Sequence, residues 1–298
     1  MPSRLREARF GRIAWAYLLI LAVAAGVGVA GAVGLALRAD GPDHAGLRAA
    51  SPSEAPTVSV SALPTALPTA LPAAPAAAGL RAFSYWRAPP GLPADPDPLS
   101  TATVAEGLRL IAGRVVYDTP GGTPKAVLPS EISGLPVTVP IVERRPGWIA
   151  VLLPSVNRTV GWLTDQGSVR VALRDQLVLR RSTHELTWFR DGVEQAGWTV
   201  ATGAPATATP LGRTFVLGRV TPDGHAYAGL DALALGSVPD DREALPASLR
   251  AGHTAIHGWY RTSAFGRSIS NGCIRVPRKG QRTLLKTIAM GTVVTVID

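Results

Sequence analysis

The sequence contains only one cysteine, Cys273, among its 298 residues. A single thiol excludes a disulfide within the chain and every metal site built from several cysteines. Unpaired thiols are easily oxidised, so an isolated cysteine is either a buried small side chain or a group whose chemistry is used. The count alone leaves both interpretations of Cys273 open.

The chain also lacks a dense cluster of basic and aromatic side chains. Its formal net charge is +9, of which residues 1–38 supply +4 through five arginines and one glutamate. Nucleic-acid-binding domains concentrate their positive charge on one face, so we expect no nucleic-acid partner. The remaining +5 suits an anionic surface, and it is equally typical of a solvated arginine-rich surface.

Charge is absent from residues 13–37, a run of 25 mainly apolar residues. About 20 such residues span a bilayer, whereas the apolar part of a cleavable signal peptide is usually shorter. The sequence therefore predicts an uncleaved transmembrane helix over 13–37, although the small residues at 30–32 leave cleavage open. Four arginines precede the run, so residues 1–12 are predicted to be a cytoplasmic tail and the rest extracytoplasmic.

Residues 38–103 are predicted to be a linker rich in proline and alanine. Residues 62–72 repeat the unit Ala-Leu-Pro-Thr with a period of four. Prolines at this frequency prevent a helix and favour extended polyproline II, which rises about 3.1 Å per residue. We expect a semi-rigid spacer.

Residues 104–168 show short runs rich in Val, Ile and Trp, separated by turn residues. The runs are 110–116, 135–142, 148–153 and 159–163. This spacing predicts a small β-barrel-like domain. Its length and Gly-Trp strand starts resemble the Src-homology-3-like modules of exported bacterial wall enzymes, and the alternative is an extra β-layer that stiffens the neighbouring domain.

Residues 169–298 also show mainly strand patterns. Asp191-Gly192 is a strong hairpin-turn signal between apolar runs. Helical spacing is restricted to 278–290, and 292–297 is predicted to be a closing strand. The pattern predicts a predominantly β domain rather than a doubly wound α/β hydrolase.

Two short segments of this domain suggest thiol chemistry: Ala255-Ile-His257-Gly-Trp259 and Ser270-Asn-Gly-Cys273-Ile-Arg-Val276. A thiol needs a nearby base, which an imidazole supplies. Gly272 allows close backbone approach, so amides near Cys273 could face a developing oxyanion. The spacing permits contact between His257 and Cys273 but does not establish it.

These segments resemble the signature of the L,D-transpeptidase (YkuD-type) family, a His-Gly strand end followed by Ser-x-Gly-Cys. Thr209-Pro-Leu-Gly-Arg-Thr-Phe215 is similar to the family's Thr-Pro-x-Gly-x-Phe turn and strand. The resemblance covers residues 170–298 and implies a YkuD-type β-sandwich catalytic domain. The sequence departs from the pattern at Asn271, where many members have His, and at Gly258, where some have a Ser that supports the base. The orienting group for His257 must then be a backbone carbonyl.

The resemblance implies a membrane-anchored, cell-wall-facing enzyme that cross-links peptidoglycan. Cys273 would form a thioester with a stem peptide, and His257 would act as its base. The remaining positions divide into site support (Ser270, Asn271 and Gly272) and substrate binding (Tyr227, Tyr260 and Arg275). We expect no cofactor, and the sequence does not indicate the oligomeric state.

Two alternatives remain open at the level of the sequence. An L,D-carboxypeptidase would use the same acyl-enzyme but resolve it with water, and a non-catalytic wall-binding module would not use the thiol. His253 and His257 have the His-x-x-x-His spacing of a zinc site, but the glutamate of a zincin is missing. We therefore expect no metal.

Overall fold

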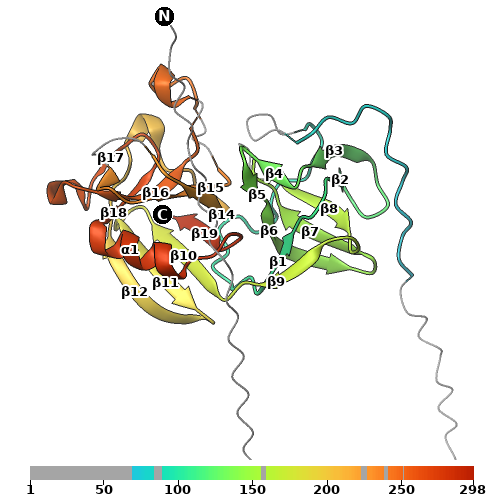
Figure 1. Cartoon of the computed structure of the whole chain (residues 1–298), viewed down its shortest axis with the longest axis horizontal. Helices are drawn as coiled ribbons and strands as arrows, with labels where there is room; N and C mark the ends of the chain where they lie inside the picture. Colours follow the sequence, from blue (N-terminus) through green and yellow to red (C-terminus); the bar gives the residue numbers. More distant parts are fainter. Residues whose placement is uncertain (1–68, 84–88, 156–158, 223–226, 238–240, 251) are drawn as a thin grey trace, which may run out of the picture. The chain divides into compact units, whose positions relative to one another are not determined.

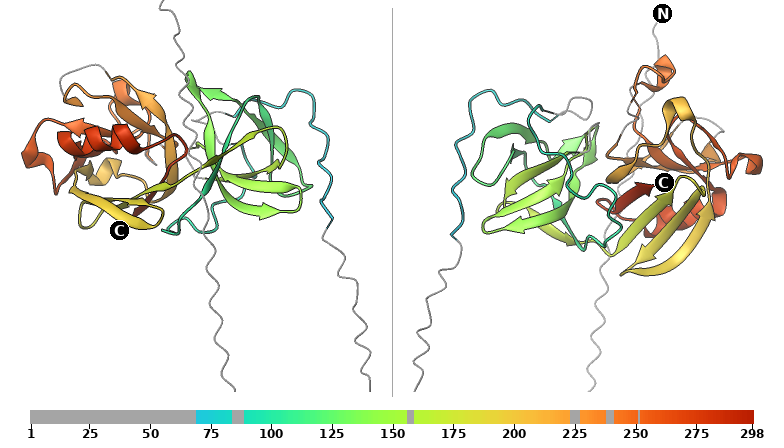
Figure 2. Two further views of the ribbon diagram at one scale, coloured as in Figure 1. Left: turned by 60° about the horizontal axis from the view of Figure 1, so that its bottom comes forward. Right: turned by 180° about the vertical axis from the view of Figure 1, so that it is seen from behind.

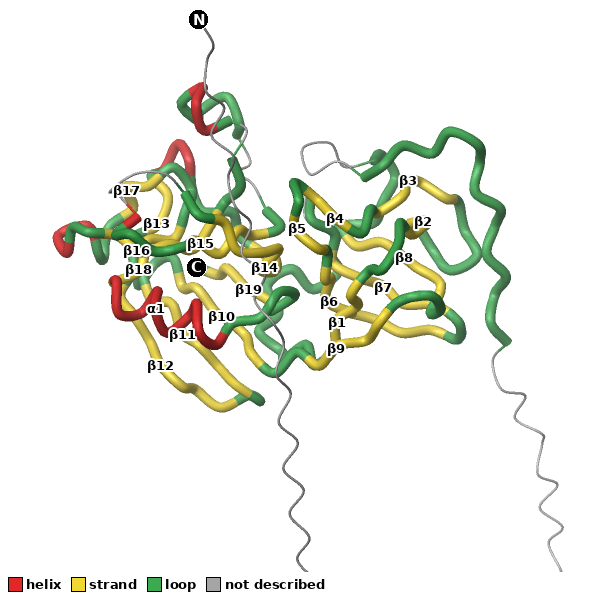
Figure 3. The backbone as a smooth tube through the Cα atoms, viewed as in Figure 1, coloured by secondary structure: helices red, strands yellow, loops and turns green. Residues whose placement is uncertain are grey.

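The computed structural model describes residues 69–83, 89–155, 159–222, 227–237, 241–250 and 252–298. The predicted transmembrane helix, the predicted tail and residues 38–68 of the predicted linker lie outside the described residues. Among the residues that the structure describes, no helix is long and apolar enough to cross a membrane. Strands predominate throughout (Figure 3), which confirms the prediction of a mainly β protein.

Residues 106–172 form a seven-stranded sheet in the order β3-β2-β8-β7-β6-β1-β9 (Figure 1). Its strands are β1 (Glu106–Arg109), β2 (Arg114–Tyr117), β3 (Pro124–Leu128), β6 (Thr138–Arg145), β7 (Trp148–Leu152), β8 (Val160–Thr164) and β9 (Val169–Ala172). Two further strands, β4 (Glu131–Ile132) and β5 (Leu135–Pro136), pair with each other. The likeness to a Src-homology-3-like barrel stays a prediction.

The continuous strand predicted over 110–116 is wrong. The chain leaves the sheet after β1 and re-enters it at β2, and Ile111 between them is 65% exposed. A Cβ atom added at Gly113 would lie 3.0 Å from the Val127 side chain. This close approach of the backbone to β3 explains why an apolar run contains a change of direction.

Residues 175–297 form an eight-stranded sheet in the order β12-β11-β10-β19-β14-β15-β16-β18. Its strands are β10 (Asp175–Arg180), β11 (Glu185–Arg190), β12 (Val193–Thr199), β14 (Gly212–Val220), β15 (Ala232–Leu235), β16 (Ala255–Trp259), β18 (Ile274–Pro277) and β19 (Val293–Ile297). The pairs β10–β19 and β16–β18 are parallel, and the other neighbours are antiparallel. Outside it, β13 (Thr202–Gly203) pairs in parallel with β17 (Ser268–Ser270).

The helix α1 (Arg278–Thr287) covers one face of the eight-stranded sheet (Figures 1 and 2). Leu284 and Ile288 pack into a core with apolar side chains from β10, β16, β18 and β19. The helix is shorter than predicted because Ile288 is already extended, with φ −81° and ψ 124°. The described residues also include the short 3-10 helices η1 (Pro205–Thr207), η3 (Ala247–Leu249) and η4 (Thr262–Ala264).

The predicted hairpin turn between β11 and β12 is confirmed. Asp191 and Gly192 both have positive φ, 51° and 78°, as a two-residue hairpin turn of type I′ requires. After this hairpin, β12 ends at Thr199 and the short strand β13 begins at Thr202.

The two sheets share part of their apolar core. Phe215 and Leu217 of β14 belong to the apolar core that is formed mainly by side chains of the seven-stranded sheet. A buried ion pair adds to this contact: Arg213 of β14 donates to both carboxylate oxygens of Asp95, with a distance of 2.8 Å from Nε to Oδ2. At β14, the eight-stranded sheet thus presents one face to the core beneath α1, through Val216, and the opposite face to the seven-stranded sheet.

Candidate active site

The catalytic residues predicted from the sequence come from β16 and β18, which are parallel neighbours. Their register pairs Ile256 with Ile274 and His257 with Arg275. Successive side chains of a strand point to opposite faces. Ile256 and Ile274 are fully buried in the core against α1, so His257 and Arg275 lie on the other face. Cys273 directly precedes β18 and, two residues before Arg275, is directed to the same face.

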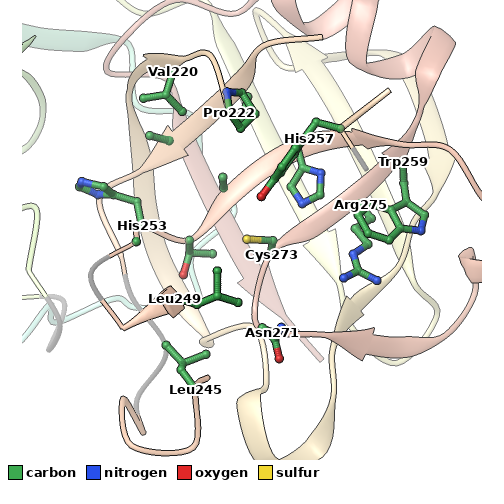
Figure 4. A pocket seen from close by; sticks show the side chains of 16 residues that line it. Val220, Pro222, Leu245, Leu249, His253, His257, Trp259, Asn271, Cys273 and Arg275 are labelled. Carbon is green, nitrogen blue, oxygen red and sulfur yellow. The ribbon is translucent and has the colours of Figure 1, made fainter. Parts of the chain in front are cut away.

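This register makes the thiol and the imidazole diagonal neighbours. Extended by one position, it sets Cys273 opposite Ala255, two residues before His257. Both side chains line one cavity, and Figure 4 shows the sulfur and the imidazole directed into it from adjacent strands. The fold therefore brings together the two groups, sixteen residues apart in the chain, that the sequence predicted as nucleophile and base.

The cavity has a volume of about 380 Å³, within the range of small-molecule sites. One part of its wall is apolar, and the part around Cys273 is polar. The lining residues are Val220, Pro222, Tyr227, Ala232, Ala234, Leu245, Leu249, Gly252, His253, Thr254, Ala255, His257, Trp259, Asn271, Cys273 and Arg275. Its shape and composition suit a ligand that is partly apolar and carries a few polar groups.

The imidazole of His257 is held in one tautomer. Its Nδ1 lies 2.9 Å from the carbonyl oxygen of Gly258. Because a carbonyl oxygen only accepts, Nδ1 carries the proton and donates it, which leaves Nε2 as the basic nitrogen. The backbone carbonyl expected to orient the base is thus that of Gly258, and the Ser found there in some family members is not needed for this bond.

The environment keeps His257 neutral. The side chain is 3% exposed, and its pKa is lowered to about 4, mainly by burial. The bond to Gly258 opposes this shift, and the positive charge of Arg275 contributes to it. A base that is deprotonated at neutral pH is ready to accept the proton of a thiol.

Aromatic rings surround the imidazole on two sides. Tyr227 meets it edge-on with a centroid distance of 4.8 Å, and Trp259 does so at 5.7 Å. The guanidinium carbon of Arg275 lies 3.7 Å from the centroid of Trp259. These contacts restrict the orientation of the ring and keep a positive charge beside the thiol.

Cys273 is partly exposed to the cavity. Burial raises the pKa of its thiol above the ordinary value, while a hydrogen bond from the backbone of Ala255 and the charge of Arg275 act in the opposite direction. With His257 neutral as well, the resting pair is a thiol beside an imidazole. The proton then moves as the sulfur attacks.

Hydroxyl groups fix the turn that presents Cys273. Ser270 Oγ donates to the carbonyl oxygen of Cys273 at 2.6 Å, and Thr209 Oγ1 donates to that of Gly272 at 2.9 Å. Thr207 Oγ1 donates to the carbonyl oxygen of Ser270 at 3.0 Å. Gly272 has φ 99°, a left-handed value that side chains with a Cβ rarely adopt. The backbone on both sides of the sulfur is therefore held by three hydroxyls.

The bond from Thr209 also orients an amide. In a trans peptide the carbonyl and the following N–H point in opposite directions. Since the carbonyl of Gly272 faces Thr209, the N–H of Cys273 faces away from it. The geometry thus fixes a hydrogen-bond donor next to the sulfur.

Only some of the other predicted site residues line the cavity. Tyr227, Asn271 and Arg275 line the cavity, whereas Ser270 and Gly272 lie behind it in the turn. Tyr260 is not in the lining; it is 54% exposed and packs against Trp259. Its role in substrate binding stays a prediction.

Sequence reasoning missed several residues that shape the site. The hydroxyls of Thr207 and Thr209 hold the turn, and Leu245 and Leu249 form part of the apolar wall. Thr209 stood in a recognised motif, but its hydrogen-bond partner is 63 residues away. His253 lines the cavity too. Across the described ranges, no group of three or more His, Cys, Asp or Glu side chains could hold a metal ion.

Comparison with family models identifies a known domain in the part of the chain that contains this site. The model of the YkuD family, described as the L,D-transpeptidase catalytic domain, matches residues 174–296. A comparison with curated proteins found no match. Similar solved structures include an L,D-transpeptidase from Mycobacterium tuberculosis H37Rv, with 19% identity over 48% of this chain and 73% of that chain and a TM-score of 0.36.

Two others are an L,D-transpeptidase from Mycobacterium smegmatis (16% identity, 48% of this chain and 74% of that chain, TM-score 0.34) and the catalytic domain of an L,D-transpeptidase from E. faecium (20% identity, 41% and 95%, TM-score 0.30). The family match includes the whole of β16 and β18 and the turn before Cys273. Residues 174–296 therefore match the YkuD family, whose model is described as the L,D-transpeptidase catalytic domain.

Proposed function

We propose that the protein is a peptidoglycan L,D-transpeptidase that forms a thioester between Cys273 and a stem peptide and transfers the acyl group to an amine. The observation that supports this most directly is the parallel register of β16 and β18, which sets the thiol and the neutral imidazole of His257 on one face of the sheet. The family match over residues 174–296 supports the same reaction class.

In the first half-reaction, the sulfur of Cys273 attacks the carbonyl carbon that precedes the terminal D-Ala of the stem peptide. The thiol proton passes to Nε2 of His257, the nitrogen left unprotonated by the bond from Nδ1 to Gly258. The tetrahedral intermediate then collapses. The C–N bond breaks, the imidazolium returns the proton to the leaving amine, and D-Ala departs from the thioester.

In the second half-reaction, an amine of a neighbouring stem attacks the thioester carbon. Nε2 of His257 accepts a proton from this amine and donates it to the departing sulfur, so the thiol and the new amide are formed together. Water in place of the amine gives a carboxylic acid and a trimmed peptide. The same two side chains serve both acceptors.

The developing oxyanion needs hydrogen-bond donors that are already in place. The N–H of Cys273, which faces away from Thr209, is the donor we assign to it. Its direction depends on the bond of 2.9 Å from Thr209 to the carbonyl of Gly272 and on the positive φ of that glycine. Ser270 restrains the next peptide by its bond to the carbonyl of Cys273.

Arg275 is assigned to the negative charge of the substrate. Its guanidinium lies over Trp259 in the cavity lining, where it can pair with the carboxylate of the stem peptide's terminal D-Ala. Asn271 and Tyr227 supply further polar atoms in the same lining. We propose that the predicted anchor over 13–37 and the spacer after it hold this domain at the cell wall.

Covalent labelling tests the nucleophile. Incubation of the full chain with a penem should add the mass of one β-lactam to the protein, and Cys273→Ala should show no adduct. His257→Ala should slow adduct formation by about two to four orders of magnitude, the range for loss of a general base. A loss below tenfold would assign the base to another group.

Product analysis tests the acceptor. Mass spectra of purified wall fragments after incubation with the protein should show cross-linked dimers. Trimmed monomers without dimers would identify an L,D-carboxypeptidase. An unchanged fragment mixture, together with no penem adduct, would leave only the wall-binding alternative.

A further inference from the structure

A short segment of the predicted linker is bound to the seven-stranded module. The indole Nε1 of Trp148 donates to the carbonyl oxygen of Leu71 at 2.8 Å, and the hydroxyl of Tyr117 donates to that of Ala74 at 2.9 Å. The partners are 77 and 43 residues apart in the chain. In Figures 1 and 2 the segment, in blue-green, runs along the outside of the module.

The two accepting carbonyls have the spacing of one turn of polyproline II. That helix has three residues per turn and no internal hydrogen bonds, so carbonyls three residues apart point the same way and are free to accept. Leu71 and Ala74 are three residues apart, and each precedes a proline, Pro72 and Pro75. A residue before proline is restricted to the extended region. The two prolines therefore favour the polyproline II conformation at Leu71 and Ala74.

The groove that receives the segment is aromatic. Tyr117, Trp148 and Trp162 form an apolar cluster against which Ala74 packs. Tyr117 and Trp148 meet edge-on with a centroid distance of 5.0 Å, and their donors stand at the correct separation for the two carbonyls. We call these three residues the aromatic groove.

Close backbone approach shows that the contact is tightly fitted. A Cβ atom added at Gly147 would lie 2.7 Å from Cβ of Ala70, and one added at Gly121 would lie 3.1 Å from Cβ of Leu71. Both glycines have positive φ. The turn before Trp148 and the turn after Tyr117 thus leave room for the segment only because they lack side chains.

The buried polar atoms of the aromatic groove also depend on the segment. Trp148 is 1% exposed and Tyr117 is 5% exposed. Buried Tyr and Trp side chains normally have a partner for their O–H or N–H, and here the segment supplies both acceptors. The groove is therefore built to hold a peptide through its carbonyl groups.

Between residues 62 and 78 the chain offers this spacing once. In the repeat over 62–72, the residues before proline are four apart, namely Leu63, Leu67 and Leu71. The spacing shortens to three between Leu71 and Ala74 because the Ala-Leu-Pro-Thr unit gives way to Leu-Pro-Ala-Ala-Pro. A groove with two donors one turn apart distinguishes these spacings.

We propose that the aromatic groove is a binding site for a polyproline II segment whose X-Pro pairs are three residues apart, and that its ligand is the chain's own segment 71–75. Binding fixes the chain at residue 71, whereas without it the first backbone bonds to the module would be those between Arg81, Phe83 and Val127. Binding therefore withdraws residues 71–80 from the spacer, and each extended residue that is withdrawn shortens the reach of the spacer by about 3.1 Å. The groove thereby sets how far the catalytic domain can stand from the part of the chain before the linker.

Proteolysis of the full chain tests the docking. Tyr117→Phe and Trp148→Phe together remove the two donors but keep an aromatic ring at each position. Elastase should cut after Ala73 and Ala76 about thirty-fold faster in the double variant, the factor expected for two ordinary hydrogen bonds. Cutting after the alanines at 62 and 66 is the internal control and should not change.

Equal cutting at 73–76 in both proteins would overturn the proposal. Protection that disappears on dilution would also overturn it, because the ligand would then come from a second copy of the chain. Circular dichroism of the double variant shows whether the module is still folded. If the module of the double variant is unfolded, the peptide experiment below tests the docking instead, because it leaves Tyr117, Trp148 and Trp162 unchanged.

The second experiment empties the groove and adds the ligand in trans. In a full chain with residues 71–75 replaced by Gly-Ser-Gly-Ser-Gly, a fluorescein-labelled peptide of sequence 69–78 should bind with saturable polarisation. The matched control is a peptide of sequence 60–69, which has the four-residue spacing and should bind at least fivefold more weakly. Equal binding of both peptides, or binding of neither, would refute the proposed specificity.

Discussion

Protonation of His257 should reduce the stability of the folded protein in weak acid. Burial lowers its pKa from 6.5 to about 4, so below pH 6.5 the unfolded chain binds a proton that the folded chain does not. The stabilisation from neutral His257 is complete above pH 6.5 and is lost as the pH falls toward 4. By this linkage, the loss is about 2 kcal/mol at pH 5 and approaches about 3 kcal/mol at pH 4.

Urea unfolding at pH 7 and pH 5 measures this contribution. The decrease in the free energy of unfolding should be about 2 kcal/mol smaller in His257→Gln than in the unmodified chain, because glutamine does not titrate. Burial also lowers the pKa of His253, so a His253→Gln variant measured in parallel separates the two histidines. If His257→Gln and the unmodified chain lose the same free energy, His257 is not neutral and buried as described, and its role as a ready base fails.

Three further predictions concern the site and the contact between the sheets. Gly272→Ala should cost about 1–3 kcal/mol of stability, since alanine is strained at positive φ, and penem acylation should slow as the amide of Cys273 moves; unchanged acylation would exclude that amide as oxyanion donor. The acylation rate should vary little between pH 6 and pH 8, because His257 is already neutral with a pKa of about 4; a steep rise through pH 6.5 in stopped-flow traces would contradict this. Asp95→Ala should destabilise the fold by about 3–5 kcal/mol in thermal unfolding, because Arg213 keeps a buried charge without its partner; recovery in the double variant Asp95→Ala with Arg213→Met would attribute the loss to that charge.

The features that the sequence predicted correctly are those set by a few adjacent residues. Asp191-Gly192 specifies a type I′ turn by itself, since both positions must take positive φ. The segments around His257 and Cys273 were recognisable because the thiol is unique and stands after a glycine.

The features that could not be predicted depend on partners distant in the chain. The parallel pairing of β16 with β18 is a choice among many possible strand neighbours, and nothing in either segment specifies it. The bond from Thr209 to Gly272 joins positions 63 residues apart. The interruption between β1 and β2 accompanies the close contact of Gly113 with Val127 of β3. The apolar residues of the run 110–116 do not indicate this contact.

The position of β19 has a consequence for folding. It lies between β10 and β14 in the eight-stranded sheet, although every other strand of that sheet is made before it. Until β19 emerges, the nascent chain consists of two half-sheets, each with an unpaired apolar edge, and such edges promote aggregation. Pairing β10 with β19 also closes a very long loop, which slows folding. We therefore expect newly synthesised chains to need protection from one another until this strand is available.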